Sequence, residues 1–559
     1  MPMTQAMLAT AREHPDRPAI VGAHQRLTYA ELLEDSARLF AVVDGLHRAQ
    51  EHPPRPAPET VGIPIAAICA ESAFEVARFI AGLAGFRAVS ATIDPRWPLA
   101  HRADVIVATG IGVVVTDTAD LAPALAERGW TGTVIDLRDF TRRIEGLRRP
   151  TAEVQVAEAP DAGDSAPAEA PPAVAAAGTL ARPAVRDGDE PFLMLFSSGT
   201  TSDPKAFLKT RAQYRENAAV SAAHLEPYPG VATLAPGPVS YSLTLYAVVE
   251  CMVTGGSVHV ADAFDPLVLA RRIDEEAITR VVVVPAVVRA LTDAARRTPE
   301  RFARLDLVVT GGANLPASIR EGLAEVLPHV RLISYYGAAE IGFIGDSRDG
   351  DGTRISIYDG IGAQIRDESG ASVPDGGIGS LWIRAAACSD GYLAGTTDEV
   401  LVGPDGWATV RDQGRMVEGQ LELVGRAGDI AITGGHKVAL PEVERAFDDV
   451  PALGAVCAVA VPDPALGSVV VLVLERPGSA ASGGAGPEGE DRDVEGPGGA
   501  TSGAVPPKAE LVAHAREHLA PQFVPRRWYR VDALPRTVGG KIRRPATRDL
   551  VLDGTAERL

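Results

Sequence analysis

The chain has 559 residues, of which 46% are hydrophobic and 23% charged, and a formal net charge of −19 at pH 7. This size and hydropathy predict a globular protein with more than one domain, and the negative charge argues against nucleic acid as a partner. The sequence shows neither a signal-like start nor a run of about 18 uncharged apolar residues, so we expect a cytoplasmic protein without a membrane span.

Short β-branched runs alternate with amphipathic stretches along the chain. The runs "VIVATGIGVVVTD" (residues 105–117) and "RVVVVP" (residues 280–285) are typical of buried strands, and "PLVLARRIDEEA" (residues 266–277) has helical period. Together they predict an α/β fold with largely buried strands.

Two segments have a composition unlike the rest of the chain. Residues 150–190 and 477–508 are rich in Ala, Gly, Pro and acidic residues and poor in large apolar ones. Such segments cannot bury enough apolar surface to fold, so we predict two disordered insertions.

The four cysteines are far apart in the sequence and have apolar neighbours. They are Cys69, Cys251, Cys388 and Cys457, with no CxxC pair among them. This pattern indicates buried free thiols.

The stretch "FLMLFSSGTTSDPKAF" (residues 192–207) runs from a predicted buried strand into small and hydroxylated residues and then a lysine. Only five lysines occur among the 54 basic residues, so a lysine here indicates a site that needs a compact ammonium group. Small residues, hydroxyls and a cation are what a phosphate-binding loop requires. A solvated Ser/Thr/Gly turn is the alternative that the loop alone leaves open.

The segment "GRAGDIAITGGHKVALPEVERAFDDV" starts at Gly425 and predicts a separate small α+β domain. Two short strands flank Gly434 and Gly435, and Pro441 opens a helix. The apolar residues of that helix recur at helical spacing and are Val443, Ala446, Phe447 and Val450.

The motifs, taken in order, resemble those of the adenylate-forming superfamily, in its acyl-CoA synthetase branch. They are "SSGTTSDPKA", "VVTGGANLP" (308–316), "YYGAAEIGF" (335–343), "GRAGDIAITGGHKVALPEVE" (425–444) and "LPRTVGGKIRR" (534–544). The resemblance implies a large N-terminal domain, residues 1–425, of stacked α/β subdomains with a β-barrel-like subdomain. A small mobile α+β domain, residues 426–559, would follow.

The resemblance also implies ATP or AMP, Mg²⁺ and coenzyme A as cofactors. Glu340 would hold Mg²⁺, Asp412 would accept from the ribose hydroxyls, and Lys541 would reach the substrate carboxylate and the α-phosphate during adenylation. The remaining expected cofactor-binding residues are Ser197, Ser198, Gly199, Thr200, Thr201, Ser202, Lys205, Gly311, Gly312, Ala313, Tyr336, Gly337, Ala338, Ala339, Arg426, Gly434, Gly435, His436 and Lys437. Tyr241, Ser242 and Gly337 are expected at the acyl pocket.

Several positions depart from the family's pattern. Ala339 stands where relatives carry a Thr that donates to the α-phosphate, and losing such a donor costs roughly 1.5 to 3 kcal/mol. Gly428 occupies the hinge position, and Tyr241 stands where relatives often carry His. Ser240 stands where amino-acid-activating domains keep an Asp, which argues for a carboxylic acid without an α-amino group.

These observations favour an ATP-dependent acid–CoA ligase acting on a small-molecule carboxylic acid. Three alternatives stay open: an enzyme that only thioesterifies a preformed acyl-adenylate because of Ala339, an adenylating enzyme that loads a carrier protein, and a non-catalytic scaffold. A homodimer is also left open.

Overall fold

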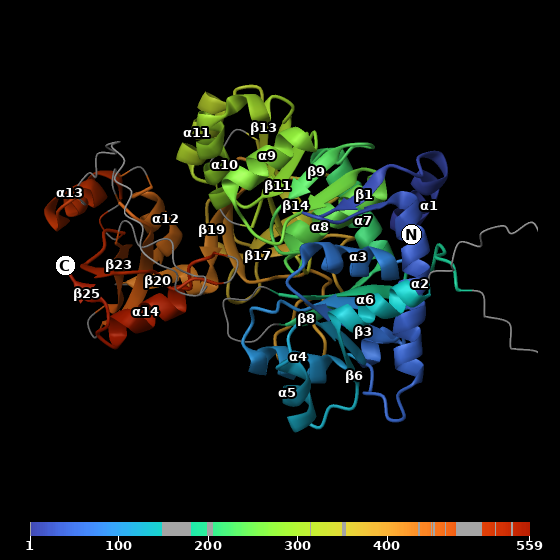
Figure 1. Cartoon of the computed structure of the whole chain (residues 1–559). Helices are drawn as coiled ribbons and strands as arrows, with labels where there is room; N and C mark the ends of the chain where they lie inside the picture. The colour runs from blue at the N-terminus through green and yellow to red at the C-terminus, as the bar shows by residue number, and fades with distance from the viewer. Residues whose placement is uncertain are drawn as a thin grey trace, which may run out of the picture. The chain divides into compact units, whose positions relative to one another are not determined.

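In the computed structural model the chain forms two compact units (Figure 1). The first comprises residues 1–196, 206–264 and 393–398, and the second residues 197–205, 265–392 and 399–559. The structure describes residues 2–147, 180–197, 205–312, 315–348, 354–433, 436–448, 450, 453–463, 466–476, 506–519, 521, 523–537 and 540–559. Most of the two predicted insertions lies outside these ranges. In the part of the first that is described, the Ala184 N–H donates to the Gly85 carbonyl at 3.0 Å.

A six-stranded sheet with the order β6-β5-β3-β4-β7-β8 forms one half of the first unit. Its strands are parallel except for β8, which returns antiparallel to β7. The bounds are β3 Ile65–Cys69, β4 Val89–Thr92, β5 Val113–Thr116, β6 Thr133–Asp136, β7 Pro191–Phe196 and β8 Ala206–Thr210. The predicted buried strand before the phosphate loop is confirmed as β7.

Helices cover both faces of this sheet, because successive strand residues point to opposite faces. Ile65, Ala67 and Cys69 pack into one core with α4 and α5, and α2, α3 and α6 lie on the other face (Figure 1). The helix bounds are α2 Tyr29–Arg48, α3 Ala73–Leu83, α4 Leu99–Thr109, α5 Leu121–Glu127 and α6 Leu137–Gly146. This two-sided burial explains the continuous apolar character of the strands.

The expectation of strand structure across residues 105–117 is wrong for its first half. Residues 105–109 form the last turns of α4, and only Val113–Thr116 form a strand. The helix ends at Gly110, whose φ of 69° suits a left-handed C-terminal cap. β-branched residues are only weakly disfavoured in helices, and here their burial against the sheet decides the outcome.

The other half of the first unit holds the strand order β9-β10-β1-β2 and three helices. The β9, β10 and β1 strands run parallel, and β2 pairs antiparallel to β1. The bounds are α1 Pro2–Glu13, β1 Pro18–Val21, β2 Arg26–Thr28, α7 Arg211–His224, β9 Ala232–Ala235, α8 Ser242–Thr254 and β10 Ser257–Val260.

The second unit begins with three parallel strands, β11 to β13, which continue into antiparallel strands in the order β14-β15-β19-β18-β17-β16. The bounds are β11 Arg280–Val283, β12 Leu307–Thr310, β13 Arg331–Ala338, β14 Gly342–Ser347, β15 Arg354–Ile357, β16 Gly362–Arg366, β17 Gly379–Arg384, β18 Asp412–Val417 and β19 Gln420–Arg426. Among the described residues this strand order does not close into a barrel.

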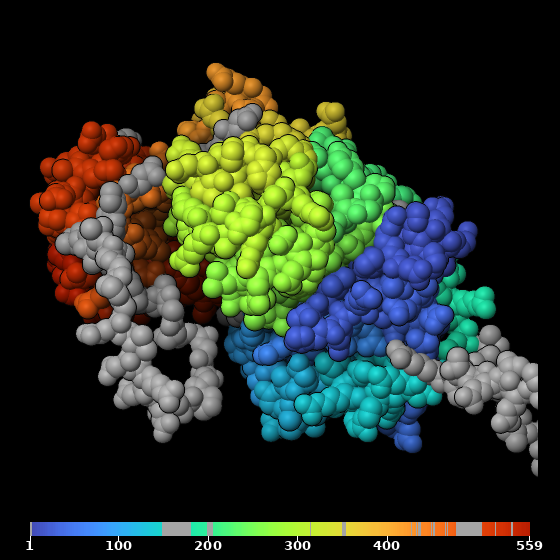
Figure 2. Space-filling model, turned by 45° about the horizontal axis from the view of Figure 1, so that its top comes forward, coloured from blue at the N-terminus to red at the C-terminus, as the bar shows by residue number. Residues whose placement is uncertain are grey.

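Three helices pack beside the parallel strands of the second unit. They are α9 Pro266–Glu275, α10 Pro285–Arg297 and α11 Ala317–Val326. They form one continuous lobe of the surface, coloured yellow-green in Figure 2. Both the predicted strand at 280–285 and the predicted helix at 266–277 are confirmed.

The C-terminal part of the second unit has its own sheet with the order β21-β20-β23-β24-β25, in which β22 also pairs with β23. The bounds are β20 Ile430–Thr433, β21 His436–Ala439, α12 Leu440–Arg445, β22 Val456–Asp463, β23 Gly467–Glu475, α13 Lys508–His518, β24 Arg527–Val531, α14 Arg544–Leu552 and β25 Glu557–Arg558. The two predicted strands and the helix that Pro441 opens are confirmed. The helix ends at Arg445, so Phe447 enters the core from a turn.

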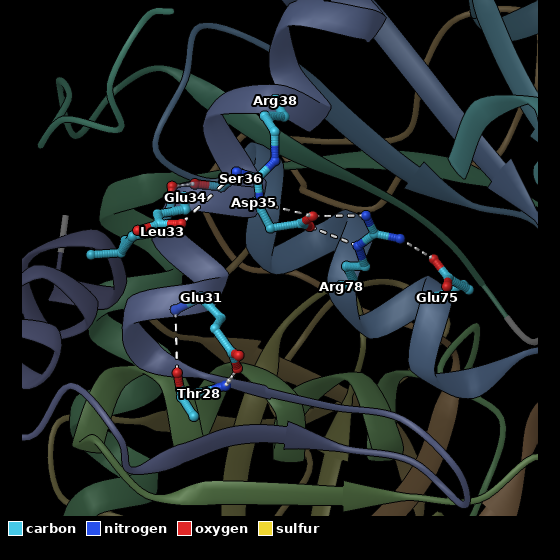
Figure 3. Close-up of polar contacts among 9 residues, drawn as sticks. All are labelled: Thr28, Glu31, Leu33, Glu34, Asp35, Ser36, Arg38, Glu75 and Arg78. Carbon is cyan, nitrogen blue, oxygen red and sulfur yellow. Dashed lines mark hydrogen bonds and ion pairs between the residues drawn. The ribbon is translucent and has the colours of Figure 1, made fainter. Parts of the chain in front are cut away.

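A buried ion pair joins two helices of the first unit. The Arg78 guanidinium donates to both carboxylate oxygens of Asp35, at 2.6 and 2.8 Å, and to Glu75 at 2.8 Å (Figure 3). Burial acts to lower the pKa of Arg78, and the hydrogen bond and charge of Asp35, with Glu75, raise it by more. Below it, Thr28 and Glu31 form a reciprocal cap at the start of α2.

Within the described residues, no helix is both long and apolar enough to cross a membrane. The same residues contain no cluster of three or more His, Cys, Asp and Glu side chains that could hold a metal ion by themselves. Three of the four cysteines are buried as expected, and Cys388 is half-buried.

Candidate functional site

Two neighbouring parallel strands of the second unit bring the expected adenine-binding residues together. The β12 strand ends at Thr310, opposite Ser334 of β13, so Gly311 lies beside Tyr335. A Cβ atom on Gly311 would lie 2.6 Å from the Tyr335 ring, and Gly312 has a φ of 81°. Glycine is therefore required at both positions, for close packing at the first and for a left-handed turn at the second.

Tyr336 and Asp412 meet directly. The Tyr336 hydroxyl donates to Asp412 Oδ2 at 2.6 Å. Asp412 opens β18, where it pairs across the sheet with Arg426 at the end of β19. The strand register thus brings three residues expected at the adenosine moiety into one place, although nothing is described of the Arg426 side chain.

Glu340 lies in the tight turn between β13 and β14 and is 6% exposed. Its Oε1 atom accepts the Tyr392 hydroxyl at 3.0 Å, and its carbonyl accepts the Ser389 N–H at 2.8 Å. Ala339 and Ala338 precede it, and the Ile341 N–H closes the turn onto Ala338 at 3.0 Å. The turn therefore holds a buried carboxylate in a fixed orientation.

Lys205 lies at the end of the expected phosphate loop. The Ser197 N–H donates to the Lys205 carbonyl at 2.8 Å, so the two ends of the loop are closed against each other. The ammonium group pairs with Glu399 and lies 5.5 Å from the centre of the Tyr392 ring. Residues 198–204, which include Ser198, Gly199, Thr200, Thr201 and Ser202, lie outside the described residues.

Tyr392 therefore touches both groups expected to act on the phosphates. Its ring lies under the Lys205 ammonium and its hydroxyl binds the Glu340 carboxylate. Glu399 in turn accepts from Arg411 at 3.3 Å. The result is a continuous row of alternating charges and one aromatic ring within the second unit.

The structure describes only some of the residues expected to act in the C-terminal domain. Lys541 is exposed on the connection between β24 and α14. Ala313, Gly434 and Gly435 lie outside the described residues, and the side chains of His436 and Lys437 are not described. Their roles stay predictions.

The expected acyl-pocket residues Tyr241 and Ser242 belong to the first unit, at the start of α8. Next to them, a fully buried Asp94 accepts from the Arg96 guanidinium at 2.8 and 2.7 Å and from the Ser240 hydroxyl at 3.3 Å. The Arg96 guanidinium lies 5.9 Å from the centre of the Tyr241 ring. A buried carboxylate is thus present beside Ser240, but Arg96 already neutralises it.

Sequence reasoning missed the partners of the expected residues. Tyr392 and Glu399 lie more than 50 residues from Glu340 and belong to none of the quoted motifs. Asp94 and Arg96 lie in "ATIDPRWP", where an acid and an arginine two positions apart could have signalled an ion pair.

Comparison with known proteins decides the family. Residues 7–393, more than half of the chain, match the AMP-binding enzyme family, and residues 442–541 match the AMP-binding enzyme C-terminal domain. The chain belongs to the AMP-binding enzyme family. This confirms the expected membership of the adenylate-forming superfamily. It also confirms the expected enzyme class, an AMP-forming acid–thiol ligase.

Relatives of this AMP-binding enzyme cover most of its length. An uncharacterized acyl–CoA ligase, YhfT of Bacillus subtilis, is 25% identical over 97% of each chain. A fatty acid–[acyl-carrier-protein] ligase, MmaC of Mycobacterium marinum, is 26% identical over 65% of this chain and 69% of its own.

Solved structures confirm the fold of this AMP-binding enzyme. ATP-bound MatB of Rhodopseudomonas palustris matches with a TM-score of 0.77 at 20% identity, over 98% of this chain and 99% of its own. MenE of Bacillus subtilis in complex with ATP and a magnesium ion matches with a TM-score of 0.73 at 18% identity, over 97% and 99%. The expected α/β class, with a large N-terminal and a smaller C-terminal domain, is thereby confirmed.

The family uses ATP, Mg²⁺ and coenzyme A, and the residues of this chain fit the metal. A single buried carboxylate, Glu340, suits Mg²⁺, which prefers oxygen ligands and is commonly held by one or two carboxylates together with substrate phosphates and water.

Proposed function

We propose that this enzyme is an ATP-dependent acid–CoA ligase that activates a carboxylate without an α-amino group through an acyl-adenylate. The observation that carries the proposal is the row formed by Lys205, Tyr392 and Glu340. One tyrosine contacts both groups, the Lys205 ammonium through its ring and the Glu340 carboxylate through its hydroxyl, and we assign the ammonium to the phosphate oxygens and the carboxylate to Mg²⁺.

The roles proposed for the residues follow from the negative charges of ATP and of the substrate carboxylate. In the first step a carboxylate oxygen attacks the α-phosphorus of ATP, and the bond to pyrophosphate breaks. Bound Mg²⁺ supplies positive charge to the phosphate oxygens. Lys205 offsets the charge of the leaving pyrophosphate, Asp412 fixes the ribose, and Lys541 aligns the substrate carboxylate with the α-phosphate.

In the second step the thiol of coenzyme A attacks the acyl carbon, the bond to AMP breaks, and the thiol proton is lost to solvent. Coenzyme A is favoured because YhfT, which matches over 97% of both chains, is named an acyl–CoA ligase. A carrier-protein thiol is the competing acceptor, since MmaC is named for that reaction.

The test is an incubation with ATP, Mg²⁺, coenzyme A and a panel of carboxylic acids that includes aryl, aliphatic and dicarboxylic members. We expect AMP, pyrophosphate and one acyl-CoA in equal amounts. Lys541→Ala should lower the rate of acyl-adenylate formation by about 10²- to 10³-fold. The matched control is Lys508→Ala, which should leave the rate unchanged, because Lys508 is exposed on α13 and donates to a C-terminal oxygen of Leu559 at 2.7 Å.

Two outcomes would count against this reading. If no acid yields either AMP or an acyl-CoA, the proposal fails and a non-catalytic scaffold gains support. If the acyl group goes to a carrier protein in direct competition with coenzyme A, the acceptor is wrong while the adenylating step stands.

Ala339 favours one second candidate, an enzyme that only thioesterifies a preformed acyl-adenylate. Ala339 directly precedes Glu340 in the β13–β14 turn and offers no hydroxyl to an α-phosphate. Synthetic acyl-AMP with coenzyme A isolates this step. If Ala339→Thr raises acyl-adenylate formation by about ten- to a hundred-fold, the candidate is supported; brisk pyrophosphate exchange by the natural enzyme rules it out.

A further inference from the structure

Lys541 is presented by a short hairpin between β24 and α14. The Thr537 N–H donates to the Lys541 carbonyl at 2.7 Å, and the Lys541 N–H donates to the Thr537 hydroxyl at 3.1 Å. Arg536 and Ile542 form an antiparallel bridge below it. The backbone of Lys541 is therefore fixed to the arms of the hairpin, while its side chain is exposed.

A single buried carboxylate holds the incoming arm of this hairpin. Glu475, at the end of β23, is 8% exposed and accepts both the Leu534 N–H at 3.0 Å and the Arg536 guanidinium at 2.6 Å. Arg536 also reaches the carbonyl of Gly540, the residue before Lys541, at 3.5 Å. Arg536 thus connects the buried carboxylate to the turn that carries Lys541.

The outgoing arm has an anchor of its own. Arg544 donates to Asp429 at 2.6 Å and to Glu444 Oε2 at 3.1 Å, and Ile542 packs on the core beneath β22 and β23. Because this arm is fixed independently, loss of the Arg536 contact would loosen the turn without releasing α14.

We propose that Arg536, held by Glu475, is the positioning residue that sets Lys541 for the adenylation step. The inference rests on the proposed function, in which Lys541 aligns two anions. Lysine is a flexible point charge, and a misplacement of about 1 Å at a reacting centre can cost on the order of a hundred-fold in rate. The Arg536–Glu475 pair limits where the base of that side chain can lie.

The experiment compares Arg536→Ala with Arg527→Ala in the full-length protein. Arg527 lies in the same domain and pairs with Asp463 at 3.4 Å, and its side chain is 35% exposed against 38% for Arg536. Acyl-adenylate formation and thioesterification of synthetic acyl-AMP are measured separately. We expect Arg536→Ala to lower kcat of the first step by about 10- to 100-fold and to change the second by less than about two-fold, and Arg527→Ala to change neither.

Two further variants separate positioning from direct action. Arg536→Lys keeps a cation beside Glu475 and should recover part of the rate. In a Lys541→Ala background, Arg536→Ala should add no further loss, because a residue that acts through Lys541 has nothing left to position. Equal losses in both steps, or additive losses with Lys541→Ala, would overturn the proposal.

Hydrogen exchange gives a readout that needs no substrate. The amides of Thr537, Gly540 and Lys541, which close the turn, should exchange about ten-fold faster in Arg536→Ala than in the natural protein, and at the natural rate in Arg527→Ala. Unchanged exchange overturns the proposal by itself. If the natural enzyme forms no acyl-adenylate from any acid, the proposed function fails first and the positioning role of Arg536 fails with it, even where exchange increases.

Discussion

At the scale of single residues, the hydrogen bond from Tyr336 to Asp412 orients the carboxylate that we propose to bind the ribose of ATP. A carboxylate that accepts a 2.6 Å hydrogen bond on Oδ2 is fixed in rotation. It can then present its remaining acceptor positions to two ribose hydroxyls in one orientation. Tyr336 would thus act twice, through its ring on adenine and through its hydroxyl on Asp412.

Tyr336→Phe tests the second of these roles. The ring is kept and the donor to a charged group is lost, a change that costs roughly 1.5 to 3 kcal/mol. We expect the KM for ATP to rise about ten-fold or more with kcat nearly unchanged, because the contact is made equally in the ground state and the transition state. The matched control is Tyr228→Phe, at an exposed tyrosine of the first unit that should have no effect. An unchanged KM for ATP in Tyr336→Phe would show that Asp412 needs no partner.

The sequence could predict the residues that belong to motifs, but not the residues that hold them. Glu340 and Asp412 could be named because their motifs resemble those of the adenylate-forming superfamily, and Lys205 because it also ends a loop of small and hydroxylated residues. Tyr392 and Glu399 could not, because only the folded chain brings them next to Glu340 and Lys205. A tertiary contact between distant positions leaves no spacing in one sequence.

At the scale of elements, buried strands and amphipathic helices were predictable where one periodicity dominated. The strand at β11 and the helix at α9 follow their patterns. Residues 105–109 did not follow the expected pattern, because a short run of mostly apolar residues fits a buried helix as well as a buried strand. The small C-terminal helix was predicted to reach Val450 and ends at Arg445, because its last apolar residues pack from a turn.

The contact between α2 and α3 yields a stability prediction. Asp35 is 2% exposed and is bound by Arg78 through two hydrogen bonds (Figure 3). Asp35→Ala leaves the Arg78 guanidinium buried, with Glu75 as its remaining charged partner among the described residues. We expect the free energy of unfolding to fall by about 3 to 5 kcal/mol, measured by denaturant titration.

Two comparisons make that measurement specific. Glu34→Ala, at an acid with 75% side-chain exposure that lies 3.9 Å from Arg38, should change the stability by less than about 0.5 kcal/mol. Replacing both partners, Asp35→Leu with Arg78→Met, should recover most of the loss, because no uncompensated charge stays buried. A double variant as unstable as Asp35→Ala would mean that packing, and not charge, holds the two helices.

At the scale of the whole molecule, buried thiols and phenols that are neutral in the folded state should make the free energy of unfolding fall at alkaline pH. Burial raises the pKa of Cys69 to about 11 and that of Cys457 to about 12, from an ordinary value of 9.0. Burial likewise raises the pKa of Tyr29, Tyr214 and Tyr358. As the pH rises, each of these groups loses its proton in the unfolded chain before it does so in the folded chain. Its contribution to the free energy of unfolding is therefore complete below the pKa that it has in the unfolded chain, and is lost as the pH rises through the pKa that it has in the folded chain.

The two thiols alone should lower the free energy of unfolding by about 2 to 3 kcal/mol between about pH 8 and about pH 10, since one pKa unit corresponds to about 1.4 kcal/mol. Denaturant midpoints of the natural protein over this range measure the total slope, to which the tyrosines add above about pH 10. Cys69→Ala with Cys457→Ala removes the thiol part, so the double variant should be less stable at neutral pH but lose less stability on the way to alkaline pH. If both proteins lose stability in parallel, the thiols do not titrate differently in the folded and unfolded chains, and the alkaline loss comes from the tyrosines.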